Sequence, residues 1–413
     1  MTTTILICDD RQDGCDHALQ HLEKVGRADG AVTLSKDSLR KALAALFEGA
    51  SELLRGCADS EKTSAPEGLA GFDLVLFDNN LADLNFGGAR LTAESVIGHL
   101  RAFTDSSYII SINKNPNVDF DLRHLFGDHG SIADLALNTP HLSRPRLWGG
   151  QNEDFAPWYW PCLPDAAAKR KKQIAFVRRN LDKTVWKALG FPDEAVDYMS
   201  RRSKALASRL SIQKNIQEVT FRDVFGANGS LDREATESID TLAREPVQWA
   251  VEAVCRVAAA EVDRWLRREI LAPQDVLIDL PHLVTRIPSL FGRRARDLAE
   301  WNGVTVGTKA PYGLNRVAYR DHVKSTRFQP DFWLSTPCFW WPTLKANTEL
   351  RQQLFKSKVN WPDAVFCEDV SAFVAMDTSI PIEIEADIEG SWPRRYIAQK
   401  ADINFSPRSR ILG

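Results

Sequence analysis

Short apolar runs alternate with amphipathic stretches along the first third of the chain. Each apolar run has the length of a buried strand, and the five runs occupy residues 3–9, 31–35, 72–78, 108–112 and 132–137. Apolar residues recur at helical spacing in the stretches between them, at 12–25, 36–57, 89–103 and near 119–126. Strands that alternate with helices in this way predict a doubly wound, five-stranded parallel α/β sheet with right-handed crossovers.

Carboxylates follow two of these predicted strands. Asp9 and Asp10 end the first strand, and Asp78 ends the third. In a doubly wound sheet the carboxyl ends of these two strands lie side by side, so the three side chains should share one pocket. Acidic residues at strand ends are often only solvated turn formers. Three acids at matching positions instead favour a cation site, and hard oxygen ligands suit Mg²⁺.

With these features, residues 1–140 resemble a response-regulator receiver domain, in which a double acid follows the first strand and an Asp ends the third. The resemblance implies a flavodoxin-like fold. It also implies that Asp78 accepts a phosphoryl group from a histidine kinase or phosphotransfer protein. A second copy of the chain, bound through the receiver-like domain as a homodimer, is a further candidate partner. The resemblance places Mg²⁺ on Asp10, Asp78 and the backbone carbonyl of Asn80, with Asp9 beside them.

Two features of the receiver pattern differ in this sequence. The hydroxyl residue expected at the end of the fourth strand is either Ser111 or, at the next position on that side, the amide Asn113. The lysine expected after the fifth strand is missing from residues 131–141. Its loss removes a charge-assisted contact to the phosphoryl group, worth about 1.5–3 kcal/mol. Two hypotheses therefore stay open: a working receiver, and a degenerate pseudo-receiver used for assembly or protein interaction.

The remainder of the chain has a different composition. Pro, Gly and Trp gather at residues 143–164, a junction ordered by packing, which connects a receiver-like domain at 1–142 to the rest of the chain. Residues 165–300 are predicted to be mainly helical, with the clearest helix at 246–270, and residues 301–413 to be α+β. We interpret this helix-rich α+β part as an effector region of unrecognised family, controlled by the receiver-like domain.

Two charged segments offer alternative functions for that region. Residues 286–327 hold nine cations against three anions, and Arg293, Arg294 and Arg296 form their densest group. This group could bind nucleic acid or another polyanion, but pairing with the acidic segment 345–389 is the favoured interpretation. On a strand over 381–389, Glu383, Glu385, Asp387 and Glu389 would share one face. These acids could hold a metal for hydrolase or nuclease chemistry, although a charged edge strand is the commoner cause of such a pattern.

Composition narrows the class of protein. The chain has 413 residues and a formal net charge of −3, which is ordinary for a globular protein and weakens the case for a dedicated nucleic-acid binder. Seven scattered cysteines support neither a disulfide framework nor a zinc ribbon. The sequence shows no membrane-spanning run and no basic leader before Asp9, so we expect a cytoplasmic protein. The isolated residues His282 and His322 are expected to be structural.

Overall fold

The structure is a computed structural model that describes residues 3–54, 66–86, 91–113, 132–150, 155–200, 203–204, 215–225, 248–288, 290–291, 296–306, 325–346, 363–383 and 394–398. Its first part contains the predicted parallel sheet, in the order β2-β1-β3-β4-β5. The strands are β1 (Ile5–Cys8), β2 (Ala31–Thr33), β3 (Leu74–Asp78), β4 (Tyr108–Asn113) and β5 (Leu135–Asn138). This order is the flavodoxin-like one, so the sequence-based α/β prediction is confirmed for this part of the chain.

Alternate residues of each strand enter separate cores on the two faces of the sheet, which explains why the strands read as continuous apolar runs. One face packs on α2 (Lys36–Leu54) and α3 (Ala93–Phe103) through residues such as Leu6, Val75 and Ile109. The other face packs on α1 (Gln12–Glu23) through residues such as Ile7, Leu76 and Ile110. The start of α3 is set by Thr92, which forms a capping box with Ser95.

The second face is completed by segments that come after β5. Two short 3-10 helices, η3 (Thr139–Ser143) and η4 (Pro145–Trp148), lead into the aromatic junction, whose Phe155 and Trp160 join the core of the sheet. Helix α5 (Leu163–Arg179) adds Leu163 and Ala167 to that core, while its later residues pack on α11. Helix α5 therefore covers this face of the sheet only with its first turns. The helix predicted near 119–126 lies outside the described residues.

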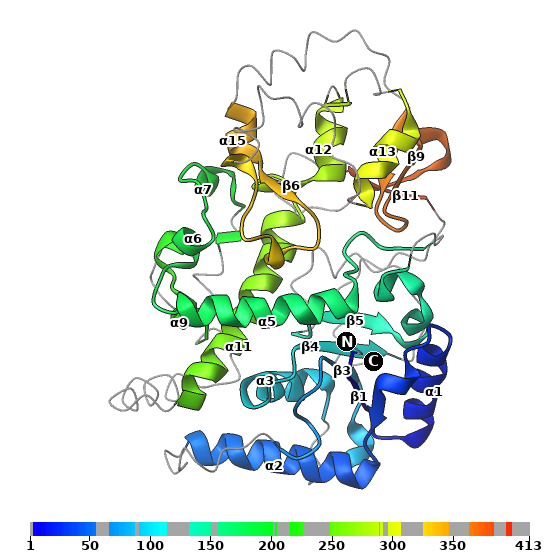
Figure 1. Cartoon of the computed structure of the whole chain (residues 1–413), viewed down its shortest axis with the longest axis vertical. Coiled ribbons are helices and arrows are strands. Elements are labelled where there is room, and N and C mark those ends of the chain that lie inside the picture. Colours follow the sequence, from blue (N-terminus) through cyan, green and yellow to red (C-terminus); the bar gives the residue numbers. More distant parts are fainter. Residues whose placement is uncertain are drawn as a thin grey trace.

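The second part of the molecule includes α11 (Gln248–Trp265), and most of it lies on the side of α5 away from α2 in Figure 1. Helix α11 continues as a π-helical turn, η6 (Leu266–Leu271), so the long helix predicted at 246–270 is confirmed over the described residues. Its other helices are α6 (Val185–Ala188), α7 (Ala195–Tyr198), α9 (Phe221–Phe225), α12 (Leu280–Arg286), α13 (Leu298–Thr305) and α15 (Trp341–Ala346). Short 3-10 turns are η1 (Ala28–Gly30), η2 (Ala82–Leu84), η5 (Ile216–Glu218), η9 (Asp331–Trp333) and η10 (Met376–Thr378).

Two small sheets belong to this second part. Strands β6 (Leu277–Asp279) and β7 (Cys338–Trp340) pair antiparallel. Strands β8 (Ala364–Cys367), β9 (Ala372–Ala375), β10 (Ile380–Glu383) and β11 (Arg394–Ile397) form a sheet in the order β10-β11-β8-β9. Ile397 of β11 reaches the core under the parallel sheet, which joins the end of the described chain to its beginning. The domain boundaries at 142, 164 and 300 stay predictions.

Candidate functional site

Three buried carboxylates converge at the carboxyl ends of β1 and β3. Asp9, Asp10 and Asp78 are 2%, 3% and 6% exposed. Each can offer an oxygen such that the three ligand atoms all lie within 4.8 Å of one another. Strands β1 and β3 are hydrogen-bonded neighbours, with Cys8 opposite Phe77, so the register brings the residues directly after them together. The clustering predicted from the sequence is therefore confirmed.

The loop after β3 folds back over this acid cluster. The Asp83 backbone N–H donates to Oδ2 of Asp10 at 2.7 Å, and the Arg11 backbone N–H donates to Oδ1 of Asp9 at 2.9 Å. The same loop is fastened to the start of α3, because the Ala93 N–H donates to the Asn79 carbonyl at 3.2 Å. These bonds fix the orientations of two carboxylates and connect the residue after Asp78 to α3.

The donor set fits a small divalent cation. Three carboxylates held this close repel one another when all are ionised, and a cation among them removes that repulsion. Oxygen-only ligation by a few carboxylates, with room for water, suits Mg²⁺ better than the softer metals that prefer sulfur or nitrogen. The arrangement can hold such an ion, and the ion would neutralise an anionic group brought to Asp78.

The structure also places the accessory residues suggested by the sequence. Ile112 lies opposite Asp78 in the β3–β4 register, with Ser111 before it and Asn113 after it. Ser111 is 2% exposed, whereas Asn113 is exposed at the open end of the sheet. Of these two candidates, Asn113 is therefore the one that solvent reaches. Asn80 is exposed as well, and its side-chain oxygen accepts from the Ala82 N–H at 3.4 Å.

The region expected to hold a lysine has other contacts. Asn138 ends β5 opposite Asn113, and Thr139 starts η3. The Thr139 hydroxyl donates to the Asn113 carbonyl at 3.3 Å. A neutral side chain therefore occupies the first position after β5, where the receiver pattern has a cation.

The two other groups of predicted site residues are described only in part. Glu383 ends β10 and lies opposite Arg394 of β11. Arg296 is exposed just before α13. The remaining members of both groups, Arg293, Arg294, Glu385, Asp387 and Glu389, lie outside the described residues, as does His322. The polyanion-binding and hydrolase hypotheses therefore stay predictions. Two other cations of the basic segment 286–327 form described ion pairs. Arg286 pairs with Asp275, and Arg327 pairs with Asp331.

A buried ionic network, which the sequence analysis missed, joins the parallel sheet to α5 and α11. Asp134, 4% exposed and adjacent to β5, accepts from Arg101 of α3 at 2.9 Å and from Arg170 of α5 at 3.0 Å. Arg170 also contacts Asp263 of α11 at 3.1 Å, and Asp263 pairs with Arg267 at 2.8 Å. The sequence held one signal of this network: Glu261 interrupts the apolar stripe of α11, and its carboxylate lies 4.0 Å from Arg101.

A second missed cluster surrounds His282. Its Nδ1 lies 2.6 Å from Oδ1 of Asp279, and its Nε2 lies 3.2 Å from Oε1 of Glu368. Arg395 of β11 contacts the same Glu368 oxygen at 2.5 Å, and Trp158 of the junction donates its indole N–H to Asp279 at 2.6 Å. Burial and the neighbouring Arg395 disfavour the imidazolium, but Asp279 and Glu368 together outweigh them and raise the pKa of His282. Two carboxylates and two cations thus balance one another, so the structural role predicted for this histidine agrees with its contacts.

Comparisons with known proteins give no family for this chain. A scan against protein-family models, a search of curated proteins and a search of solved structures each found no match. Among the residues that the structure describes, no helix combines the length and the apolar character needed to cross a bilayer. The cysteines in the described ranges are free thiols, as expected from their scattered spacing.

Proposed function

We propose that this chain is a response-regulator-like signalling protein whose receiver-like part accepts a phosphoryl group on Asp78 in a Mg²⁺-dependent reaction. The observation that carries the proposal is the convergence of Asp9, Asp10 and Asp78 within 4.8 Å at the switch point of a 2-1-3-4-5 parallel sheet. The proposed donor is a histidine kinase or phosphotransfer protein.

In the proposed reaction, a carboxylate oxygen of Asp78 attacks the phosphorus of the donor. A P–O bond to Asp78 forms as the bond from phosphorus to the donor nitrogen breaks, and the electron pair leaves with that nitrogen. Mg²⁺, held by Asp9, Asp10 and Asp78 with the Asn80 carbonyl, would supply positive charge to the phosphoryl oxygens. Asn113, which is exposed and directly follows the residue opposite Asp78, is the proposed donor to the transferred group.

The proposed output runs through α3. The first residue of α3 is hydrogen-bonded to Asn79, directly after Asp78. The last turn of α3 is bound by Arg256 of α11, which donates to the carbonyls of Arg101 at 3.1 Å and Ala102 at 2.5 Å. A phosphoryl group at Asp78 would change the charge at one end of this helix, and the other end contacts the proposed effector region.

The test is labelling of the purified chain with acetyl phosphate and Mg²⁺, followed by intact-mass measurement. We expect one added phosphoryl group in the wild type and none in Asp78→Asn or in the presence of EDTA. Asp83→Asn is the matched control, because it removes an exposed carboxylate from the same loop while its backbone N–H to Asp10 remains. We expect it to be labelled like the wild type.

A different result would favour the pseudo-receiver hypothesis. The neutral Thr139 after β5 is the observation on its side, since a receiver without the usual cation holds a phosphoryl group less tightly. Absence of labelling by acetyl phosphate, together with absence of beryllofluoride binding in the presence of Mg²⁺, would overturn a phospho-accepting role for Asp78. Labelling that persists in Asp78→Asn would overturn the assignment of this residue.

A further inference from the structure

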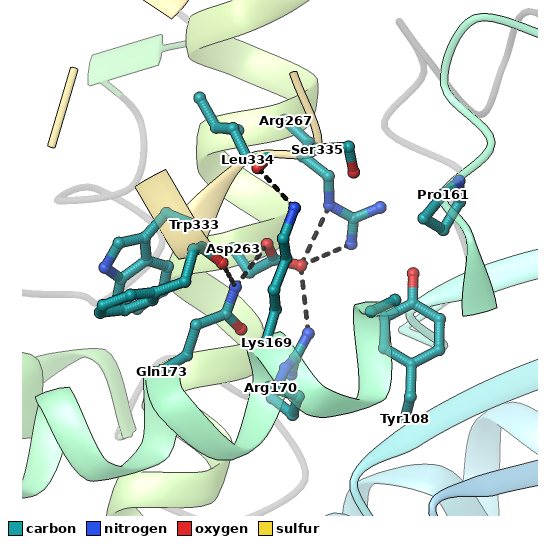
Figure 2. A pocket seen from close by; sticks show the side chains of 12 residues that line it. Tyr108, Pro161, Lys169, Arg170, Gln173, Asp263, Arg267, Trp333, Leu334 and Ser335 are labelled. Atoms are coloured by element: carbon teal, nitrogen blue, oxygen red, sulfur yellow. Dashed lines mark hydrogen bonds and ion pairs between the residues drawn. The ribbon is translucent and has the colours of Figure 1, made fainter. Parts of the chain in front are cut away.

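A separate pocket lies between α5, α11 with η6, and the segment after η9. Its empty volume is about 300 Å³ including its open mouth, and Figure 2 shows the side chains that line it. Tyr108, at the start of β4, forms one wall, whereas Asp78 lies opposite Ile112, four residues further along the same strand. At about 3.3 Å per residue, the pocket is therefore roughly 13 Å along the strand from the acid cluster. It is a different site.

Positive charge exceeds negative charge around this pocket. Its lining includes the cations Lys169, Arg170 and Arg267 and one carboxylate, Asp263. Asp263 is already engaged, since Oδ1 accepts from the Gln173 amide at 3.2 Å and Oδ2 contacts both arginines at 2.8–3.1 Å. The neighbouring Asp134 is matched by Arg101 in addition to Arg170. The lining thus retains an excess of positive charge that a small anion would balance.

Within the part of the chain that the structure describes, three side chains of the lining have a buried polar atom without a partner. One is the indole N–H of Trp333, and the other two, Arg170 and Gln173, lie on α5. The Nε–H of Arg170 is buried without an acceptor, in a residue that is 2% exposed. The Oε1 atom of Gln173 is buried without a donor, in a residue that is 3% exposed. Leaving such groups unsatisfied is costly, so both atoms indicate a missing polar ligand.

The orientation of the Gln173 amide is fixed by its other contacts. Its Nε2 donates to Asp263 and, at 3.1 Å, to the Phe332 carbonyl. A flipped amide would place its oxygen against these two acceptors, so the free position must be the oxygen. A ligand here therefore needs an atom that accepts from Arg170 and another that donates to Gln173.

The mouth of the pocket adds further donors. Lys169 donates to the Leu334 carbonyl at 3.1 Å, and the two other hydrogens of its ammonium group are available to a ligand. In Figure 2 the Lys169 and Arg267 side chains approach each other from α5 and η6, and the Tyr108 hydroxyl points toward the Arg267 guanidinium. Burial raises the pKa of Tyr108 to about 12, so this hydroxyl keeps its proton at neutral pH, and it donates that proton to the Asp134 carbonyl at 3.4 Å.

We infer that this pocket binds a phosphate group that carries a proton. Hydrogen phosphate accepts several hydrogen bonds through its unprotonated oxygens and donates one through its P–O–H group. It thus matches the positive lining, the Arg170 donor and the Gln173 acceptor together. Sulfate has similar size and charge but no proton at neutral pH, so the Gln173 oxygen would repel it. The source of the group is either inorganic phosphate or a small phosphomonoester.

The test is calorimetric titration of the full chain with inorganic phosphate, sulfate and a small phosphomonoester, glycerol 3-phosphate. EDTA and the Asp78→Asn background keep the acid cluster out of the measurement, so this result is independent of the proposed phosphoryl transfer. We expect phosphate to bind at one site and at least tenfold more tightly than sulfate, because sulfate leaves the Gln173 oxygen unsatisfied. Tighter binding of glycerol 3-phosphate than of phosphate would identify a phosphomonoester as the source, and the reverse would identify inorganic phosphate.

Two lysines of α5 provide a matched pair of variants. Lys169→Gln removes a cation from the lining and should weaken phosphate binding by about tenfold or more. Lys172→Gln removes an exposed cation from the same helix outside the lining and should leave binding unchanged. Equal binding of phosphate and sulfate, equal effects of the two variants, or no phosphate binding would each overturn the inference. The phosphate–sulfate comparison uses no lysine variant, so it decides the matter even where Lys169→Gln does not fold.

Discussion

Replacement of Asp134 by Asn tests whether the buried network binds the parallel sheet to the helices beyond it. The carboxylate is 4% exposed and accepts hydrogen bonds from Arg101 at 2.9 Å, Arg170 at 3.0 Å and the Ile109 N–H at 2.8 Å. The amide has nearly the same shape but no charge. Its substitution would leave two buried guanidinium groups short of a negative partner, with little change in packing.

The expected cost is large. Arg101 and Arg170 are 6% and 3% exposed at their side chains, so solvent does not screen the loss. Breaking a buried pair by removing one partner costs about 3–5 kcal/mol. Because the free energy of unfolding of a native protein is about 5–15 kcal/mol, Asp134→Asn should remove a substantial fraction of it.

The pH dependence of this cost has a definite sign. Burial raises the pKa of Asp134, but Arg101, Arg170 and the Ile109 N–H together outweigh burial and lower it below its ordinary value. A carboxyl group with a lowered pKa in the folded state stabilises the fold at pH values above its unfolded-state pKa of about 3.9. This contribution is lost as the pH falls through the folded-state pKa. The difference between wild type and variant should stay constant from pH 7 to about 5 and shrink below about 4.

Urea unfolding followed by tryptophan fluorescence at several pH values measures this difference. Lys171→Met is the control, because it removes an ion pair to Asp73 between α5 and the start of β3, where the Lys171 side chain is 60% exposed. Such a surface pair contributes about 0–1 kcal/mol. A loss below 1 kcal/mol in Asp134→Asn, or a loss equal to that of the control, would refute the reasoning.

Three further predictions concern the other contacts. Mg²⁺ at 100 times its dissociation constant should add about 2.7 kcal/mol to the free energy of unfolding of the wild type. Thermal unfolding in Mg²⁺ and in EDTA measures this gain, which should be smaller in Asp10→Asn; equal gains in the two proteins would argue against the site. Replacement of His282 by Gln removes a cation between Asp279 and Glu368 and should cost about 3–5 kcal/mol below pH 6.5. Because the pKa of His282 is raised in the folded state, its contribution to the free energy of unfolding is complete below the unfolded-state pKa and is lost as the pH rises through the folded-state pKa. A cost in urea unfolding that does not change with pH would contradict this assignment. Arg256→Met removes a cation from the last turn of α3 and should cost about 1.5–3 kcal/mol, with faster amide hydrogen exchange there; unchanged protection would argue against this contact.

The sequence was most informative where contacts are local or repeat along the chain. Strands buried on both faces must be apolar throughout, so the five runs could be located, although the structure begins the last of them at Leu135, three residues later than predicted. The acid cluster followed from strand order alone. The pairing of β6 with β7 and the placement of Asp134 beside Arg170 could not be predicted, because they join segments far apart in sequence that carry no periodic pattern. Glu261, a carboxylate within the apolar stripe of α11, was a signal of the buried ionic network but not of the β6–β7 pairing.

The position of Ile397 has a consequence for how this protein is made. Ile397 is 1% exposed in the core beneath a sheet whose first strand begins at Ile5. A ribosome adds Ile5 long before it adds Ile397, so the apolar surface that Ile397 covers stays uncovered on the nascent chain until the segment between these two residues has been synthesised. Newly made chains therefore pass through a period in which chaperones, or one another, can bind this surface.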